Sequence, residues 1–396
     1  MKIYKNIKTL YTFKGFAKKE GVKPVDKDFA PIKDAALVVN KGVVEWVGKE
    51  KDLPKDYKGK VYDLKGFNVY PSFTESHTHL VFGGDRKAEF EKKINGATYQ
   101  EIQKSGGGIS KTVKDTAKIS LKDLIKVSQK RVNKFKKQGV SLLEVKSGYG
   151  QNLKNEMKQL EAAFSLKGVK IKPTYLALHS FKGDKLEYVH RVVNKDLPKV
   201  LERFPKLDRV DLFVEKGFFD LDDLKVLATK ALGSELTFCV HSDQLSFCKS
   251  ALGSAKLGAL SVEHAVYLKD KEINEMSKYP TVVNLLPAAD FYLDTKYPNA
   301  RKLIDAGVRV SLATDYNPGS SPTQDLSFIG VLARRQMKMS LAEVWCAYTV
   351  NASRALGVFD KGSLIKGFSA DFFTSENEPE DFFYEVGSHP VQKLYN

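Results

Sequence analysis

Eight short apolar runs, separated by more polar segments of helical pattern, constrain the fold of this chain most strongly. They span residues 69–79, 141–148, 172–179, 209–217, 236–243, 260–266, 281–287 and 310–315. Apolar strands that alternate with helices are typical of parallel β/α folds, and eight of them predict a (β/α)8 barrel. Active sites on this fold lie at the carboxyl ends of the strands. The last polar residues of each run are therefore the first candidates for function.

The ends of these runs are rich in residues that bind metal ions or move protons. Five of the seven histidines in the chain lie there, and the eighth run ends in an aspartate. The end residues are His77, His79, Lys146, His179, Glu215, His241, His264 and Asp315. Because the strands of a barrel end on the same face, we expect these side chains to gather at one site.

The first run carries two histidines, His77 and His79, in alternating positions of a strand, so both imidazoles can face the barrel mouth. His241 and Asp315 complete a set of three imidazoles and one carboxylate, which suits zinc or iron. We therefore predict one metal ion per chain, Zn²⁺ or Fe²⁺/Fe³⁺. Such an ion lowers the pKa of a bound water from about 15.7 to about 7, and the resulting hydroxide is the predicted nucleophile of a hydrolase.

Other end residues are candidates for proton transfer and for substrate contacts. Asp315 can accept the proton of the attacking water as well as bind the ion. His264 either hydrogen-bonds that water or polarises the group under attack, unless it is a core histidine with satisfied hydrogen bonds. Glu215 stands where two-metal barrels of this kind carry a bridging modified lysine, so we expect a single ion. Lys146 either serves a substrate or pairs with an acid such as Glu144.

Composition narrows the classes of function. The net charge of +16 comes mainly from lysines dispersed along the chain, so we expect no nucleic-acid partner. No apolar run reaches the roughly 18 residues of a membrane span, and we expect no membrane partner. Three cysteines are too few for a disulfide framework, and residues 1–20 lack the pattern of a signal peptide. We therefore predict a cytoplasmic protein.

The two ends of the chain differ from its middle. Residues 36–40 (ALVVN) and 43–48 (VVEWVG) flank Lys41-Gly42, which predicts a β-hairpin outside the barrel. The segment after Gly362 has a similar pattern. A length of 396 residues exceeds one simple core, which favours a large domain with a smaller one beside it.

Several strings around the candidate ligands are similar to a known family. They are PSFTESHTHLVFGGDR (71–86), HSDQLS (241–246), SVEHAVYL (261–268) and ATDYNPGSSP (313–322), together with FEKKINGATYQEI, SGGGI and EVKSGYG. With them the chain resembles the imidazolonepropionase family of the amidohydrolase superfamily, from about Tyr70 to Gly357.

The resemblance implies a fold and an activity. The fold would be a catalytic barrel over residues 69–358 and a small β-sandwich built from residues 1–68 and 359–396. The activity would be the hydrolytic opening of the ring of 4-imidazolone-5-propanoate to N-formimidoyl-L-glutamate in histidine degradation, with a metal-bound hydroxide attacking the ring carbonyl. One zinc or iron ion is implied, on the four ligands already chosen.

The resemblance also implies substrate contacts. They are Arg86, Tyr149, His179 and Gln244 for the imidazolone, and Asn317, Gly319 and Ser320 for the opened product. A guanidinium fork matches the propionate carboxylate of the substrate, which suits Arg86. Without the resemblance, Arg86 would be interpreted as a surface ion pair and Tyr149 as a packing residue, and Pro318-Gly319 would be interpreted as a plain turn.

Two alternative functions remain open for this chain. Single-metal deaminases generally carry a glutamate where this chain has Gln244, which cannot shuttle a proton, so an aminohydrolase acting on a purine, pyrimidine or other cyclic amidine is the second hypothesis. A non-enzymatic scaffold ranks last because all four ligands are present. The glycine-rich stretch 105–110 predicts a flap over the site or a flexible linker. A homodimer is expected on the strength of related enzymes.

Overall fold

Eight parallel strands form the larger of two sheets in the computed structural model, which describes residues 1–96, 101 and 106–396. Neighbouring strands follow the chain order around the sheet. Their bounds are β6 (Phe73–Glu75), β7 (Val140–Lys146), β8 (Lys170–Leu178), β9 (Arg209–Val214), β10 (Thr237–Ser242), β11 (Ser261–His264), β12 (Val282–Leu285) and β13 (Arg309–Leu312). The predicted barrel is confirmed, and its strands begin and end within a few residues of seven of the eight predicted runs.

The barrel closes just beyond the ends of its first and last strands. The backbone N–H of Asp315 donates to the carbonyl of His77 over 3.1 Å, and that of His79 donates to the carbonyl of Tyr316 over 3.0 Å. A parallel bridge joins Thr78 and Tyr316. These bonds hold the segments after β6 and β13 side by side.

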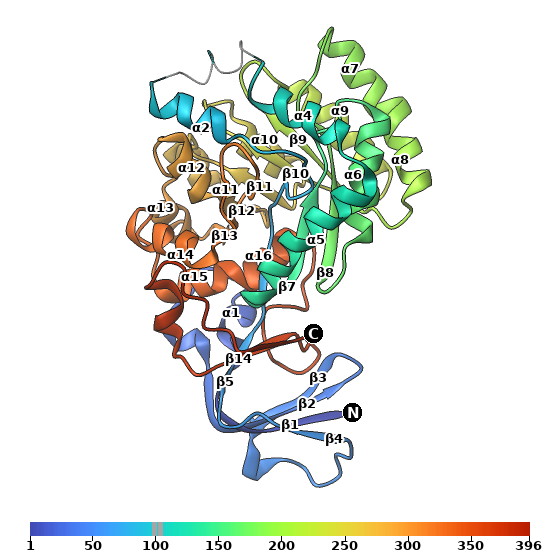
Figure 1. Cartoon of the computed structure of the whole chain (residues 1–396). Coiled ribbons are helices and arrows are strands. Elements are labelled where there is room, and N and C mark those ends of the chain that lie inside the picture. Colours follow the sequence, from blue (N-terminus) through green and yellow to red (C-terminus); the bar gives the residue numbers. More distant parts are fainter. Residues whose placement is uncertain (97–100, 102–105) are drawn as a thin grey trace.

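Helices cover the outside of the barrel (Figure 1). The helices of the barrel are α2 (Lys87–Ile94), α4 (Ile109–Lys118), α5 (Leu121–Lys137), α6 (Leu153–Ser165), α7 (Lys185–Arg191), the π-helical turn η3 (Val192–Asp196), α8 (Leu197–Arg203), α9 (Leu221–Gly233), α10 (Ser250–Lys256), α11 (Asp270–Met276), α12 (Pro287–Leu293), α13 (Ala300–Asp305), α14 (Leu326–Arg335), α15 (Leu341–Tyr348) and α16 (Val350–Ala355). Short helices elsewhere are α1 (Lys14–Lys18), η1 (Asp26–Phe29), η2 (Glu50–Asp52) and η4 (Pro379–Phe383).

Helix α5 shows how sequence directs these elements. Leu124, Val132 and Phe135 recur at helical spacing and are buried on one face. The Ser120 side chain accepts a hydrogen bond from the Asp123 N–H and so caps the first turn. None of the helices that the structure describes is both long and apolar enough to span a membrane.

The second sheet is built from both chain ends and has seven strands. They are β1 (Lys2–Tyr11), β2 (Pro31–Asn40), β3 (Val43–Lys49), β4 (Lys60–Asp63), β5 (Asn68–Pro71), β14 (Phe372–Ser375) and β15 (Lys393–Tyr395). β2 and β3 form the predicted hairpin, in which Lys41 and Gly42 have φ angles of 49° and 81°. β14 returns to pair antiparallel with β5. Figure 1 shows this sheet beneath the barrel, beside both termini.

The predicted first barrel strand, residues 69–79, is wrong in one respect, because the structure divides it between the two sheets. β5 pairs with β1 and β14, whereas β6 pairs with β7 in the barrel. Residues 68–79 are all buried, so an apolar pattern cannot reveal where the pairing partners change. β5 begins at Asn68, which places it across the predicted limit between residues 68 and 69. The limits of the two domains stay a prediction.

An aromatic cluster joins the second sheet to the barrel. Trp345 of α15 packs against Tyr70 and Phe73, with ring centroids 5.1 Å apart in both pairs. Phe373 of β14 packs against the same two rings. This hydrophobic cluster therefore bridges the two sheets, while Tyr4, Ile7, Leu37 and their neighbours form a separate cluster at the small sheet.

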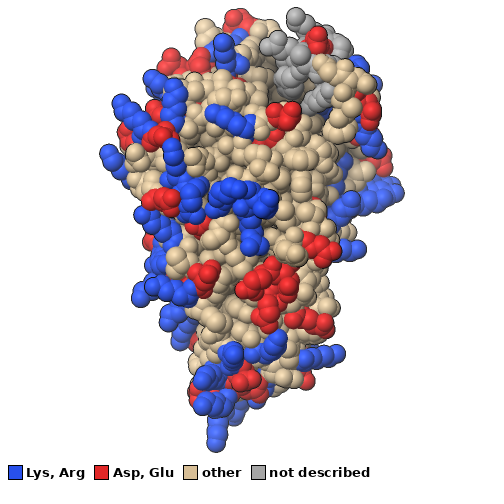
Figure 2. Space-filling view, turned by 90° about the vertical axis from the view of Figure 1, so that its left-hand side faces the viewer, with Lys and Arg blue, Asp and Glu red and all other residues tan. Residues whose placement is uncertain are grey.

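The basic side chains are dispersed. On the face shown in Figure 2, lysines and arginines are spread from the barrel to the small sheet, with acidic groups among them. This matches the even distribution of lysines along the sequence.

Candidate metal centre and substrate cavity

Three histidines converge at the carboxyl end of the barrel. His77 and His79 lie just beyond β6, and His241 lies near the end of β10. The Nε2 atom of His79 is 3.3 Å from Nε2 of His77 and 3.2 Å from Nε2 of His241. All three residues are buried. In the described part of the chain, these three form the group whose geometry could hold a metal ion.

Asp315 adds a carboxylate to this group. Its Oδ1 atom lies 3.4 Å from Nε2 of both His77 and His79. That buried oxygen has no hydrogen-bond donor among the described residues. Such an orphaned acceptor beside three imidazole nitrogens is what a metal ion would satisfy, and the donor set suits zinc or iron. The residues present therefore fit the predicted ion.

The protonation states of His77 and His79 favour metal binding, whereas that of Asp315 makes it depend on pH. Burial, with smaller contributions from nearby positive groups, holds the pKa of His77 and of His79 well below the usual value, so both imidazoles are neutral and can offer a lone pair. Burial raises the pKa of Asp315 to about 7. An ion would compete with a proton for that carboxylate at neutral pH.

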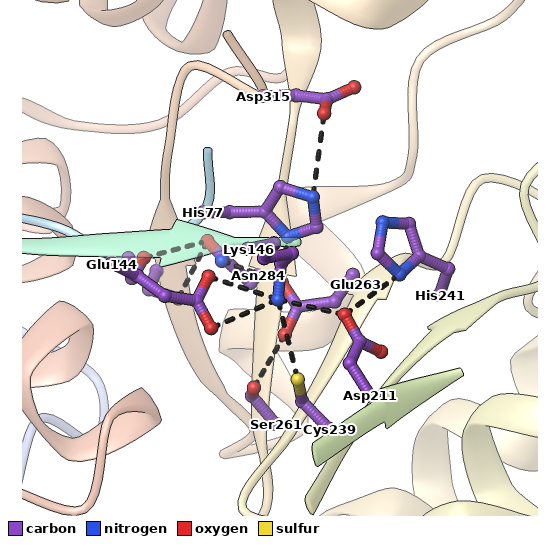
Figure 3. Close-up of polar contacts among 12 residues, drawn as sticks. His77, Glu144, Lys146, Asp211, Cys239, His241, Ser261, Glu263, Asn284 and Asp315 are labelled. Atoms are coloured by element: carbon purple, nitrogen blue, oxygen red, sulfur yellow. Dashed lines mark hydrogen bonds and ion pairs between the residues drawn. The ribbon is translucent and has the colours of Figure 1, made fainter. Parts of the chain in front are cut away.

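Two buried carboxylates orient the ligand rings (Figure 3). Nδ1 of His77 lies 2.9 Å from Oε2 of Glu263, and Nδ1 of His241 lies 3.1 Å from Oδ2 of Asp211. A proton held on each Nδ1 leaves the Nε2 lone pair for the ion. The sequence analysis missed both acids, because Glu263 and Asp211 lie inside strands rather than at their ends.

A buried charge network lies beneath the ligands (Figure 3). Lys146 Nζ is 2.8 Å from Asp211 Oδ2 and 2.9 Å from Glu144 Oε2. Arg209 Nε donates to Glu144 Oε1 over 3.2 Å. Burial alone would lower the pKa of Lys146, but Asp211 and the other neighbouring acids hold it well above its usual value. Of the two predicted interpretations of Lys146, the structure supports pairing with acids rather than contact with a substrate.

Glu75 ties the first and last strands together near the ligands. Its buried carboxylate accepts the backbone N–H of His77 over 3.2 Å and that of Thr314 over 3.1 Å. Burial raises the pKa of Glu75 to about 8. Glu75 therefore links the segments that carry His77 and Asp315. The sequence analysis gave Glu75 no role, because nothing in its place before His77 indicates this contact.

A cavity of about 390 Å³ opens beside this cluster. Of the residues predicted as metal ligands, proton-transfer groups or substrate contacts, all except His77 line the cavity. These residues are His79, Arg86, Tyr149, His179, His241, Gln244, His264, Asp315, Asn317, Gly319 and Ser320. The structure adds residues that the sequence analysis missed, namely Ile109, Phe213, Leu245, Leu293, Asp294 and Thr295. Most of these are apolar or lie on helices and loops, where no spacing distinguishes a cavity wall from ordinary packing.

His179 and His264 flank the metal cluster. Nδ1 of His179 donates to the carbonyl of Gly148 over 2.9 Å, so Nε2 is left as an acceptor. Burial lowers the pKa of His179 to about 4 and that of His264 well below its usual value. His264 has a φ of 71°, and its ring centroid lies 5.5 Å from that of His241. Both are neutral imidazoles that line the cavity, and their contact with a substrate stays a prediction.

The turn after β13 is built around Asn317. Its Oδ1 accepts the backbone N–H of Gly319 and of Ser320, each over 2.8 Å. Its Nδ2 donates to the carbonyl of Asp315 over 2.7 Å. The Asn317 side chain therefore shapes the turn, and its contact with a product stays a prediction.

Glu215 does not line the cavity. Its Oε2 accepts the N–H of Leu245 over 2.8 Å and that of Ser246 over 3.3 Å, and its Oε1 accepts the N–H of Lys216 over 3.0 Å. The carboxylate thus holds the loop that follows Gln244. This use is consistent with the predicted single ion, because the acid is already engaged with backbone donors.

The predicted flap falls partly outside the described residues. Ser105 lies outside them, as do positions 97–100 and 102 of the strings that suggested the family. Within the described part, Gly108 precedes α4, and Ile109 lines the cavity. Whether the stretch closes over a ligand stays a prediction.

Comparisons with known proteins identify a matching family model, relatives in sequence and relatives in fold. The model of the Amidohydrolase family matches residues 230–392. The chain is 44% identical to the imidazolonepropionase of Bdellovibrio bacteriovorus over 404 aligned residues, which cover 100% of this chain and 95% of that relative. Two solved structures share the fold at low identity. A guanine deaminase from C. acetobutylicum with bound guanine has a TM-score of 0.73 at 16% identity, covering 100% of this chain and 98% of the deaminase. An adenosine deaminase from Xanthomonas campestris with bound zinc has a TM-score of 0.73 at 14% identity, covering 100% and 91%.

Proposed function

Because the chain belongs to the imidazolonepropionase family of amidohydrolases, we propose that it hydrolyses the ring of 4-imidazolone-5-propanoate to N-formimidoyl-L-glutamate in histidine degradation. One observation carries this proposal: a single cavity joins a cluster of three histidines and an aspartate to a buried arginine. The cluster supplies a hydrolytic centre, and the arginine supplies a partner for a carboxylate.

The reaction adds one water molecule to the ring. The water oxygen bonds to the ring carbonyl carbon, the adjacent C–N bond breaks, and the leaving nitrogen takes up a proton. A zinc or iron ion held by His77, His79, His241 and Asp315 would make that water nucleophilic at neutral pH. Zinc is the ion bound in the adenosine deaminase of similar fold, and iron accepts the same donors.

The side chains around the cluster would move the protons. Asp315 Oδ1 points to the cluster, and the pKa of Asp315, raised by burial to about 7, suits a group that accepts a proton and returns it near neutral pH. His264 is a neutral imidazole beside His241, and in our proposal it polarises the carbonyl or delivers the proton to the leaving nitrogen.

The rest of the cavity would position the substrate. Arg86 binds the propionate, and His179, Tyr149 and Gln244 face the ring. Nε2 of His179 can accept a ring N–H, because its Nδ1 proton is committed to Gly148. The turn at Asn317 would present its backbone to the opened product. These assignments, like a cytoplasmic location and a homodimer, are proposals.

A direct assay tests the proposed function. Purified protein loaded with zinc or with iron is incubated with 4-imidazolone-5-propanoate, and loss of the ring's ultraviolet absorbance is followed while metal content is measured by elemental analysis. We expect loss well above the spontaneous rate, with one ion per chain. Loss at the spontaneous rate with full metal content would reject the proposal. Ammonia release from a purine, pyrimidine or other cyclic amidine would instead support the aminohydrolase alternative.

A further inference from the structure

The guanidinium of Arg86 is held on one side only. Its Nε donates to Oε2 of Glu89 over 2.8 Å, and both side chains are buried. Among the described residues, no hydrogen bond is made by its two terminal nitrogens. Arg86 nevertheless lines the cavity beside the metal cluster. The side chain is therefore oriented by Glu89 while most of its donors are available to a ligand.

Glu89 also holds a second segment. Its other oxygen, Oε1, accepts the backbone N–H of Gly108 over 3.1 Å. Gly108 immediately precedes α4, whose first residue, Ile109, lines the same cavity. One carboxylate thus joins the arginine to the start of this helix, although Glu89 and Gly108 are 19 residues apart.

Two glycines lie beside the guanidinium, and one of them is needed for the close approach of the backbone. A β-carbon on Gly319 would lie 1.9 Å from Nη1 of Arg86, which no side chain tolerates. Gly108 has φ 68° and ψ −149°, a conformation open essentially to glycine, and a β-carbon there would lie 4.0 Å from Nη2. The backbone at Gly319 therefore lies directly against the guanidinium, and the backbone at Gly108 lies near its other terminal nitrogen.

From these contacts we infer that Glu89 is a positioning residue for carboxylate recognition, which holds the terminal nitrogens of Arg86 in the orientation that binds the carboxylate arm of a ligand and fastens the start of α4 beside them. The inference rests on the proposed function for its substrate class. A guanidinium matches a carboxylate with two parallel hydrogen bonds only when its plane is fixed, so the orientation matters as much as the charge.

The effect of guanidinium orientation on anion binding can be distinguished from the effect of the Glu89 charge. Removing Glu89 takes one negative charge away from Arg86, which by charge alone would strengthen its attraction for an anion. If orientation governs recognition, the same change weakens anion binding, because the guanidinium is free to rotate and α4 loses its tie. The sign of the effect therefore distinguishes the two.

Calorimetry with two stable probes provides the test. Imidazole-4-propanoate carries ring and carboxylate, whereas 4-methylimidazole carries the ring alone. In Glu89→Ala we expect binding of imidazole-4-propanoate to weaken roughly 10- to 100-fold, the range for one lost hydrogen bond to a charged group, with 4-methylimidazole unchanged. Glu89→Gln retains one acceptor and should recover part of the affinity. With the imidazolone as substrate, the loss should appear in KM rather than in kcat.

Controls keep the outcomes distinct. Glu91→Gln alters an exposed acid on the same helix and should bind both probes as wild type does. Metal content and melting temperature of each variant report whether the fold is intact, and Glu89→Gln decides the matter if Glu89→Ala does not fold. Unchanged or tighter binding of imidazole-4-propanoate in folded Glu89 variants would overturn the inference. If Arg86→Ala leaves the preference for imidazole-4-propanoate intact, the arginine is not the anchor, and the inference is overturned even if wild-type protein turns over the imidazolone.

Discussion

At the scale of single residues, burial determines the chemistry of the metal centre. The same loss of solvent that keeps His77 and His79 neutral also favours the protonated form of Asp315, whose pKa is raised to about 7. Two groups of the cluster are thus ready to bind an ion at neutral pH, and a third must first lose a proton.

Metal affinity should therefore depend on pH. A carboxyl with a raised pKa is protonated below about 7, so a metal ion must displace a proton there, whereas above pH 7 the carboxylate is free. We expect binding roughly fivefold weaker at pH 6 than at pH 7, with a further gain of about twofold by pH 8 from this group. Competition with a chelator of known pH dependence measures it. Equal affinity at pH 6 and pH 8 would contradict the prediction, and Asp315→Asn should remove the dependence.

Asp211→Asn is expected to weaken metal binding by roughly 10- to 100-fold, because His241 loses the carboxylate that holds its Nδ1 proton, and Lys146 loses a buried counter-charge. Chelator competition measures the affinity, and the absorption spectrum of the cobalt-substituted protein reports the ligand geometry. Asp208→Asn, which removes a half-exposed acid next to the same strand, serves as the control. An Asp211→Asn protein that binds metal as wild type does would show that the ring needs no such partner.

At the scale of elements, the ends of neighbouring strands support one another. Glu215 follows β9 yet holds the loop that follows β10, where Gln244 and Leu245 line the cavity. The predicted ligand His241 lies within β10 itself rather than on that loop. Substrate binding and metal binding should therefore respond differently to a change at Glu215.

Glu215→Gln should raise KM several-fold while metal content stays at one ion per chain. The amide retains an acceptor but loses the charge-assisted bonds to Leu245 and Ser246, which are worth roughly 1.5–3 kcal/mol. Steady-state kinetics and elemental analysis measure both quantities, and Lys216→Gln, an exposed neighbour, is the control. Loss of metal together with activity would mean that the loop supports the ligands as well.

At the scale of the whole molecule, the two sheets are not energetically separate. The aromatic cluster around Trp345 includes Tyr70 of β5 and Phe73 of β6, so apolar packing is continuous across the junction between the small sheet and the base of the barrel. Such packing couples the two parts, because neither can unfold without exposing apolar surface that the other buries. We therefore expect this chain to unfold cooperatively, although its strands form two sheets.

Phe373→Ala should lower the free energy of unfolding by roughly 3–5 kcal/mol and leave a single transition. Fluorescence is a suitable measurement because the chain has two tryptophans, Trp46 in β3 of the small sheet and Trp345 in the cluster that bridges the sheets. Coincident denaturation curves from Trp46→Phe and Trp345→Phe proteins would show cooperativity, and two separate midpoints would contradict it. Phe359→Ala, at an exposed position, should cost far less.

The sequence by itself determined the barrel and the hairpin and predicted the metal ligands, because each depends on a local pattern. Apolar runs specify strands, and a polar residue that ends such a run has little reason to be there unless it serves the shared face of the barrel. His77, His79, His241 and Asp315 could therefore be predicted before any contact was known, and the structure brings them together.

Only the tertiary structure decided which groups support those ligands. Asp211 and Glu263 lie within buried strands, where alternation cannot tell an acid that orients a histidine from one that pairs with a lysine. The division between β5 and β6 was hidden for a similar reason, because both strands are buried. The role inferred for Glu89 includes its hydrogen bond with Gly108, and this contact arises only when the chain folds. Local patterns record which residues are buried, whereas the partners of a buried charge are set by strands and loops distant in sequence.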